Sequence, residues 1–120
     1  MKGDGNLKFT FTENTLMIIP LVYKEHRLDD DERLRFACLF KTPDGNLPYV
    51  HDIEEDNKGE NGPDGEFTFT LDMSKYKILP GRYNFEIQQI LASGSLITLC
   101  VKSDCVIDII PSVIGEVVNK

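Results

Sequence analysis

The two histidines have the widest chemical repertoire in this 120-residue chain, because an imidazole can act as a general base or bind a metal near neutral pH. His26 lies in a charged stretch between Glu25 and Arg27, and His51 directly precedes Asp52. Neighbouring residues of a strand point to opposite faces, so His51 and Asp52 cannot together activate a nucleophile. We therefore expect no catalytic residue and no enzymatic activity.

Acidic residues dominate the charge of the chain and gather in one part of it. Of the 20 Asp and Glu residues, 12 fall within residues 29–66, and the net charge is −7. Acid-rich loops can bind Ca²⁺, but the spacing of an EF-hand loop is absent. We interpret this cluster, which includes the loop of residues 54–65, as solvated surface, and we expect no metal and no cofactor. A protein of this charge is also a poor partner for nucleic acid or for an anionic membrane surface.

The three cysteines, Cys38, Cys100 and Cys105, contain no CxxC pair. An odd number without metal-binding spacing is typical of free thiols in a reducing compartment. We expect three free thiols, and the alternative is a Cys100–Cys105 pair across a hairpin.

Alternation of apolar and polar residues runs through most of the chain, and no helical period is sustained. Asp72 is placed to cap a short helical turn near residues 73–78, and Pro20 lacks the amide that a central strand needs. Short strands separated by turn residues predict an all-β, antiparallel two-sheet sandwich over residues 1–110, with a small barrel as the alternative. The 7–8 strands expected lie within residues 7–11, 16–22, 34–40, 47–53, 66–71, 82–90, 96–102 and 105–110.

A motif in the second half of the chain carries a resemblance. The segment GEFTFTL begins at Gly65, LPGRYNFEIQ begins at Leu79, Thr98 and Leu99 follow in a hairpin, and VIDII begins at Val106. This order resembles the immunoglobulin-like domains of bacteriophage virion proteins, notably the N-terminal domain of upper baseplate proteins and small tail or head accessory proteins. The likeness covers residues 65–110 well and residues 3–53 in outline.

The resemblance implies an immunoglobulin-like sandwich in which Pro80, Gly81 and Tyr83 determine the fold. Pro80 and Gly81 make a tight turn, and the Tyr83 hydroxyl bonds back to nearby backbone as in a tyrosine corner. It also implies a non-enzymatic structural protein of a virion, made in the host bacterial cytoplasm. Its partners would be other capsid, tail or baseplate subunits, and it would be present in several copies or as a homo-oligomer.

Upper baseplate proteins continue past this domain, whereas this chain ends at Lys120, which favours a small accessory protein of the capsid, head fibre, tail or baseplate. Residues 111–120 form a tail with apolar side chains at helical spacing: Val113, Ile114, Val117 and Val118. We expect this tail to be either a loose end or an arm that packs on a neighbouring subunit.

A carbohydrate- or host-surface-binding module is the alternative function. Sugar sites on sandwich domains stack their ligands on exposed aromatic rings, and the chain has no Trp. The rings that could serve are Tyr23, Tyr49 and Tyr76. This alternative requires them to be exposed on one face.

Overall fold

The computed structural model describes residues 7–57, 62–100 and 104–112. Within these ranges the chain forms eight strands and one 3-10 turn, which confirms the predicted all-β fold. The proposed arm residues Val113, Ile114, Val117 and Val118 lie outside the described residues. The elements are β1 (Leu7–Thr12), β2 (Leu16–Tyr23), β3 (Arg33–Thr42), β4 (Gly45–Ile53), β5 (Gly65–Asp72), η1 (Met73–Lys75), β6 (Gly81–Ile90), β7 (Leu96–Cys100) and β8 (Cys105–Ile110).

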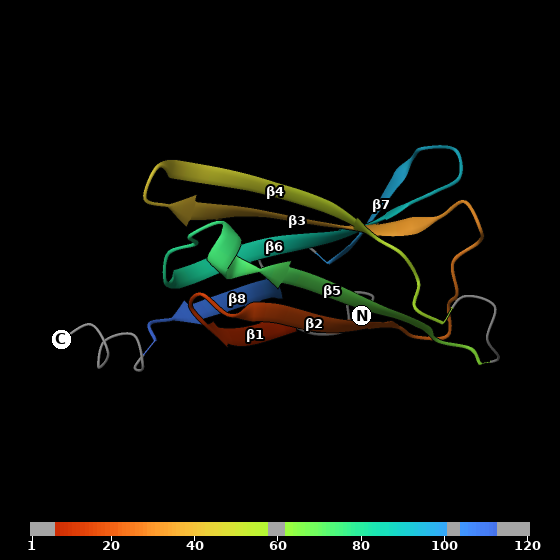
Figure 1. Ribbon diagram of the computed structural model, residues 1–120. Helices are drawn as coiled ribbons and strands as arrows, with labels where there is room; N and C mark the ends of the chain where they lie inside the picture. Colours follow the sequence, from red (N-terminus) through yellow and green to blue (C-terminus); the bar gives the residue numbers. More distant parts are fainter. Residues whose placement is uncertain (1–6, 58–61, 101–103, 113–120) are drawn as a thin grey trace.

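The strands form two sheets. The larger has the order β1-β8-β6-β3-β4, with β7 also paired to β6, and the smaller consists of β2 and β5. Figure 1 shows the strands running along the length of the molecule, with η1 towards one end and the loops after β2 and β4 at the other. In immunoglobulin-like sandwiches the second and fifth strands likewise face a sheet that holds the third, the sixth and the last.

The core between the sheets is aromatic at its centre. Phe36 of β3 stacks on Phe69 of β5 with ring centroids 4.0 Å apart, and it lies 5.3 Å from Phe85 of β6. All three rings are buried, as the alternation of their strands predicts. Burying a side chain of this size stabilises the fold by roughly 1.5–3 kcal/mol, so these three positions join the two sheets firmly.

β1 and β8 pair in parallel, with Leu7 opposite Cys105 and Thr12 opposite Ile110. The other strand pairs in the described residues are antiparallel. The expectation of a wholly antiparallel sandwich is therefore wrong at this edge. Alternation assigns each side chain to a face, but it does not depend on the direction in which the neighbouring strand runs.

Pro20 occupies the open edge of the smaller sheet. Glu66 of β5 donates its amide to Asn57 Oδ1 at 3.0 Å, and its carbonyl accepts another loop amide at 2.7 Å, so its backbone groups point away from β2. Val22 pairs with Glu66 and must then direct its own backbone groups to the open edge, as must Pro20 two residues earlier. The predicted edge position of Pro20 is confirmed, and its missing amide blunts that edge.

Two turns connect strands of the fold, and the second of them was predicted. β3 and β4 form a hairpin in which Thr42 pairs with Gly45, and Gly45 adopts a φ of +127° that side chains with a Cβ rarely reach. Asp72 caps η1 by accepting a hydrogen bond from the Ser74 amide at 3.1 Å. The helical segment is shorter than expected and ends at Lys75.

Candidate functional site

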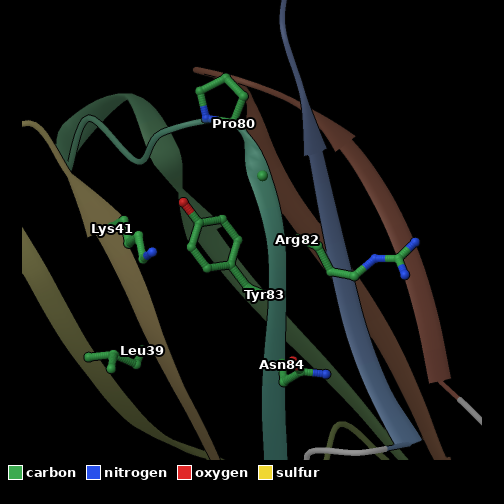
Figure 2. Close-up of a pocket in the computed structure, with 7 residues that line it drawn as sticks. Leu39, Lys41, Pro80, Arg82, Tyr83 and Asn84 are labelled. Atoms are coloured by element: carbon green, nitrogen blue, oxygen red, sulfur yellow. The ribbon is translucent and has the colours of Figure 1, made fainter.

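The larger sheet forks between β3 and β6. The two strands pair from Arg33 opposite Ile90 to Cys38 opposite Phe85, and no further pair joins them in the described residues. Beyond Cys38, β3 continues only with β4, while residues 81–84 of β6 pair with β8. Figure 2 shows the two strands diverging on either side of the Tyr83 ring.

Tyr83 holds the fork in place from the core side. Its ring packs edge-on against Phe40 with centroids 5.2 Å apart, and its hydroxyl donates to the Leu79 carbonyl at 2.6 Å. The Leu79 amide in turn donates to the Lys41 carbonyl at 2.9 Å. Burial raises the pKa of Tyr83 above its ordinary value. The predicted tyrosine corner is present, and it ties β3 to the start of β6.

Pro80 and Gly81 lead the chain into β6. Gly81 has a φ of +152°, a region that favours glycine. Pro80 cannot donate a backbone hydrogen bond, and it precedes the first strand residue, where none is needed. The sequence placed these two residues and Tyr83 in one turn. A Cβ at Gly81 would lie 4.0 Å from the Tyr83 hydroxyl, and Figure 2 shows Pro80 and Tyr83 at the same end of β6.

On its outer side the fork leaves a hollow of about 570 Å³. A second hollow of about 300 Å³ adjoins it over β3 and β4, and Leu39 and Asn84 line both. Leu39 is 55% exposed and Val50 is 59% exposed, the highest values among the large apolar residues described. The first hollow is lined by Leu39, Lys41, Pro80, Gly81, Arg82, Tyr83 and Asn84, and the second by Ala37, Cys38, Leu39, Pro48, Tyr49, Val50, Asn84 and Glu86.

Ion pairs frame this outer face. Asp52 accepts from Arg33 at 3.0 Å and from Arg35 at 3.3 Å. At the far side of the sheet, Asp108 accepts from Arg82 at 2.8 Å and lies 3.8 Å from Lys8. The hydrogen bonds from Arg82 lower the pKa of Asp108, and the charges of both basic groups act in the same direction.

Two charged residues on the same face take no part in these ion pairs. Among the described residues, neither the Lys41 ammonium nor the Glu86 carboxylate forms an ion pair. Glu86 faces outward, as its alternation with Phe85 and Ile87 predicted. The outer face therefore combines an exposed apolar centre with two unpaired charges of opposite sign. We name it the forked face and define it by Ala37, Leu39, Lys41, Pro48, Val50, Asn84 and Glu86.

Neither histidine lies in a catalytic arrangement in the described part of the chain. His26 stacks on Tyr23 with ring centroids 4.4 Å apart, and His51 packs edge-on against Phe69 at 5.9 Å. Asp52 pairs with arginines on the opposite face from His51, as the strand argument predicted. Among residues 7–57, 62–100 and 104–112, no three His, Cys, Asp or Glu side chains group as a metal site would require.

One acidic residue contradicts the expectation of a solvated acidic loop. The Glu55 side chain is only 1% exposed, and its Oε1 accepts from Arg27 Nε at 3.0 Å. Arg27 also donates to the carbonyls of Asn57 and Gly62. One guanidinium therefore binds two separate parts of the loop of residues 54–65. Glu55 is buried because Arg27, 28 residues earlier in the chain, neutralises it. No local sequence signal could have indicated this pairing.

The tyrosines considered for sugar stacking do not form a platform. Tyr23 is buried, and its hydroxyl donates to Gln89 Oε1 at 3.3 Å. Tyr49 packs between the rings of Phe40, Phe69 and Tyr76 on the core side of β4. Only Tyr76 of these three is substantially exposed, at 38%. The proposed set of exposed rings was therefore wrong.

The cysteines also differ from the expectation of three free thiols. Cys100 and Cys105 form a disulfide, with Cα atoms 6.5 Å apart, so the alternative pairing is the one observed. Cys38 is free and buried, and loss of water around it raises its pKa to about 12. A buried thiol of high pKa is unreactive, which assigns Cys38 a packing role.

No protein family and no curated protein sequence matches this chain. No helix in the described ranges is long and apolar enough to cross a membrane. Interpretation of the forked face therefore depends on its own geometry and on the motif resemblance noted in the sequence.

Proposed function

We propose that this chain is a non-enzymatic structural protein of a bacteriophage virion, a small accessory component of the capsid, head fibre, tail or baseplate. It acts by docking onto other virion proteins and is made in the host bacterial cytoplasm. The observation that carries the docking role is the exposure of Leu39 and Val50 at the centre of a sheet face. Apolar side chains grouped on an outer face favour association, because covering them removes apolar surface from water.

The core does not need these side chains. Phe36, Phe40 and Phe85 fill the inner face of the same strands and are fully buried. Leu39 lies between core residues in the sequence but points the opposite way, so only another molecule could bury it. A residue of this kind contributes to binding rather than to folding.

The motif supports the virion part of the proposal. The segments that resemble phage immunoglobulin-like domains correspond to β5, β6, β7 and β8, and the tyrosine corner of Tyr83 lies within them. Such a fold is compatible with many functions, so the resemblance supplies the context and the exposed face supplies the activity.

Co-sedimentation tests the proposal. Tagged chain is added to gradient-purified particles of the phage that encodes it, made without the endogenous copy, and the mixture is sedimented again. We expect saturable recovery of the chain with the particles, at a fixed number of copies per particle. Recovery no higher than that of an unrelated sandwich domain of similar charge would contradict the proposal.

A further inference from the structure

We propose that the forked face is the contact between two copies of this chain, in a symmetric pair centred on Leu39. This inference rests on the proposed assembly function and names its first partner. In a twofold pair, the same patch on both copies must be complementary to itself. The forked face meets that requirement in shape and in charge.

The shape complementarity comes from a ridge beside a hollow. Leu39 is 55% exposed and stands between the two hollows, both of which it lines. When two such faces meet near Leu39, each leucine packs against the other and enters the hollow beside it. Val50 and Pro48 extend the apolar contact on β4. The charged pairs around Asp52 lie at the rim, as interface charges usually do, whereas Arg82 of the Asp108 pair lines the first hollow itself.

The charge complementarity comes from Lys41 and Glu86. Glu86 lies beside Ala37, its partner on β3. Lys41 lies four residues beyond Ala37 on the same strand, roughly 13 Å from it, and Leu39 lies midway between Ala37 and Lys41. A twofold axis passing close to Leu39 and across the strands brings each Lys41 onto the Glu86 of the other copy. Two ion pairs then close over the apolar centre, and they use two charges of this face that form no ion pair with any other described residue.

The other apolar surface does not suit a second copy. The outer face of the smaller sheet carries Leu16, Ile18 and Val22 on β2, but β5 places Glu66 and Asp72 beside them. Two copies that met through this face would bring carboxylates towards carboxylates, which costs free energy. This face therefore provides a matched control for the forked face.

Pairing through the open edges of β2 and β4 is also disfavoured. Pro20 lies at the open edge of β2, and Pro48 lies in β4, one of the two end strands of the larger sheet. A proline has no amide to donate to an added strand. The second copy is thus expected to meet the face of the sheet and not its edge.

Sedimentation equilibrium of the full chain tests this inference. We expect a monomer–dimer equilibrium for the native chain, a monomer for L39D and an unchanged dimer for I18D, whose parent residue is 50% exposed on β2. Far-ultraviolet circular dichroism and urea unfolding verify that each variant is folded. A native chain that stays monomeric, or equal effects of L39D and I18D, would overturn the inference.

A charge reversal makes the test specific for symmetry. K41E and E86K should each weaken the dimer roughly tenfold or more, because like charges then face each other. The double variant K41E/E86K should recover most of the native affinity, since the pairs re-form with reversed sign. Absence of recovery would contradict the twofold arrangement. A chain that is monomeric but still sediments with particles would refute this inference and leave the proposed function standing.

Discussion

The Tyr83 hydroxyl donates a hydrogen bond of 2.6 Å to the carbonyl of Leu79, four residues earlier in the chain. The ring of the same side chain packs edge-on against Phe40 of β3, so a single side chain connects β3, the turn before β6 and β6 itself. This connection fixes the angle at which the sheet forks, and the fork exposes Leu39 on the other side. The tyrosine corner and the proposed docking surface are thus two sides of one structural feature.

Replacing Tyr83 by Phe should lower the free energy of unfolding by about 1–2 kcal/mol, because the Leu79 carbonyl loses a partner in a buried site. Urea denaturation monitored by tyrosine fluorescence measures this change. Y76F is the control, since Tyr76 is 38% exposed and water can replace what its hydroxyl loses. Equal costs for the two variants would mean that the corner does not stabilise the fold.

Replacing Gly81 by Ala should destabilise the protein by about 1–3 kcal/mol, because a Cβ disfavours a φ of +152°. A Cβ at this position would approach only Tyr83 Oη, at 4.0 Å, so backbone strain and not a clash is the cause. Gly94 has a φ of +92° in the β6–β7 turn and gives a comparison at a site away from the fork. An unchanged urea midpoint for G81A would show that the turn relaxes without strain.

The buried pair of Arg27 and Glu55 should be worth far more than an exposed pair of similar geometry. R27M leaves the Glu55 carboxylate buried without its cation and should cost about 3–5 kcal/mol. R33M breaks the pair with Asp52, which has the same 3.0 Å distance but lies at the surface, and should cost no more than about 1 kcal/mol. Urea unfolding measures the free energy of unfolding of both variants. Similar losses in R27M and R33M would contradict the role assigned to burial.

Cys38 should make stability fall in alkaline solution. Its pKa is raised by burial from 9.0 to about 12, so the unfolded chain ionises first. The stabilising contribution is complete below pH 9 and is lost as the pH rises towards 12. In C38A this part of the pH dependence should disappear, as unfolding measured between pH 8 and 11 would reveal. At pH 8 a thiol reagent should react with Cys38 only after unfolding.

Asp108 should act in the opposite pH range. Hydrogen bonds from Arg82 lower its pKa below the ordinary 3.8, with the charge of Lys8 in support. A carboxyl with a lowered pKa stabilises the folded state above its ordinary pKa and loses this effect as the pH falls through the lowered value. Titration of the Asp108 carboxyl by NMR should show this shift, and R82Q should move the pKa back towards 3.8. A pKa that R82Q leaves unchanged would assign the shift to another cause.

Much of the fold was readable in the sequence because its signals are local. Alternation in Phe67, Phe69 and Leu71 assigned these residues to the core, and all three are buried. The position of Tyr83 after Pro80 and Gly81 predicted the corner. Each of these inferences needs only the geometry of one strand or one turn.

The forked face was not predictable in the same way. Alternation places Leu39 outward, but where β3 stops pairing with β6 depends on how two distant strands diverge. The burial of Glu55 depends on Arg27, and a run of acidic residues gives no indication of a cation so far away in sequence. The parallel pairing of β1 with β8 joins the two ends of the domain. All three features arise from contacts that the local pattern does not encode.

Quantitative mass spectrometry of gradient-purified particles tests the virion assignment most directly. The chain should be present in particles of the phage that encodes it, at a constant ratio to the major structural proteins and in multiple copies per particle. A chain that is abundant in infected cells but absent from purified particles would contradict the assignment.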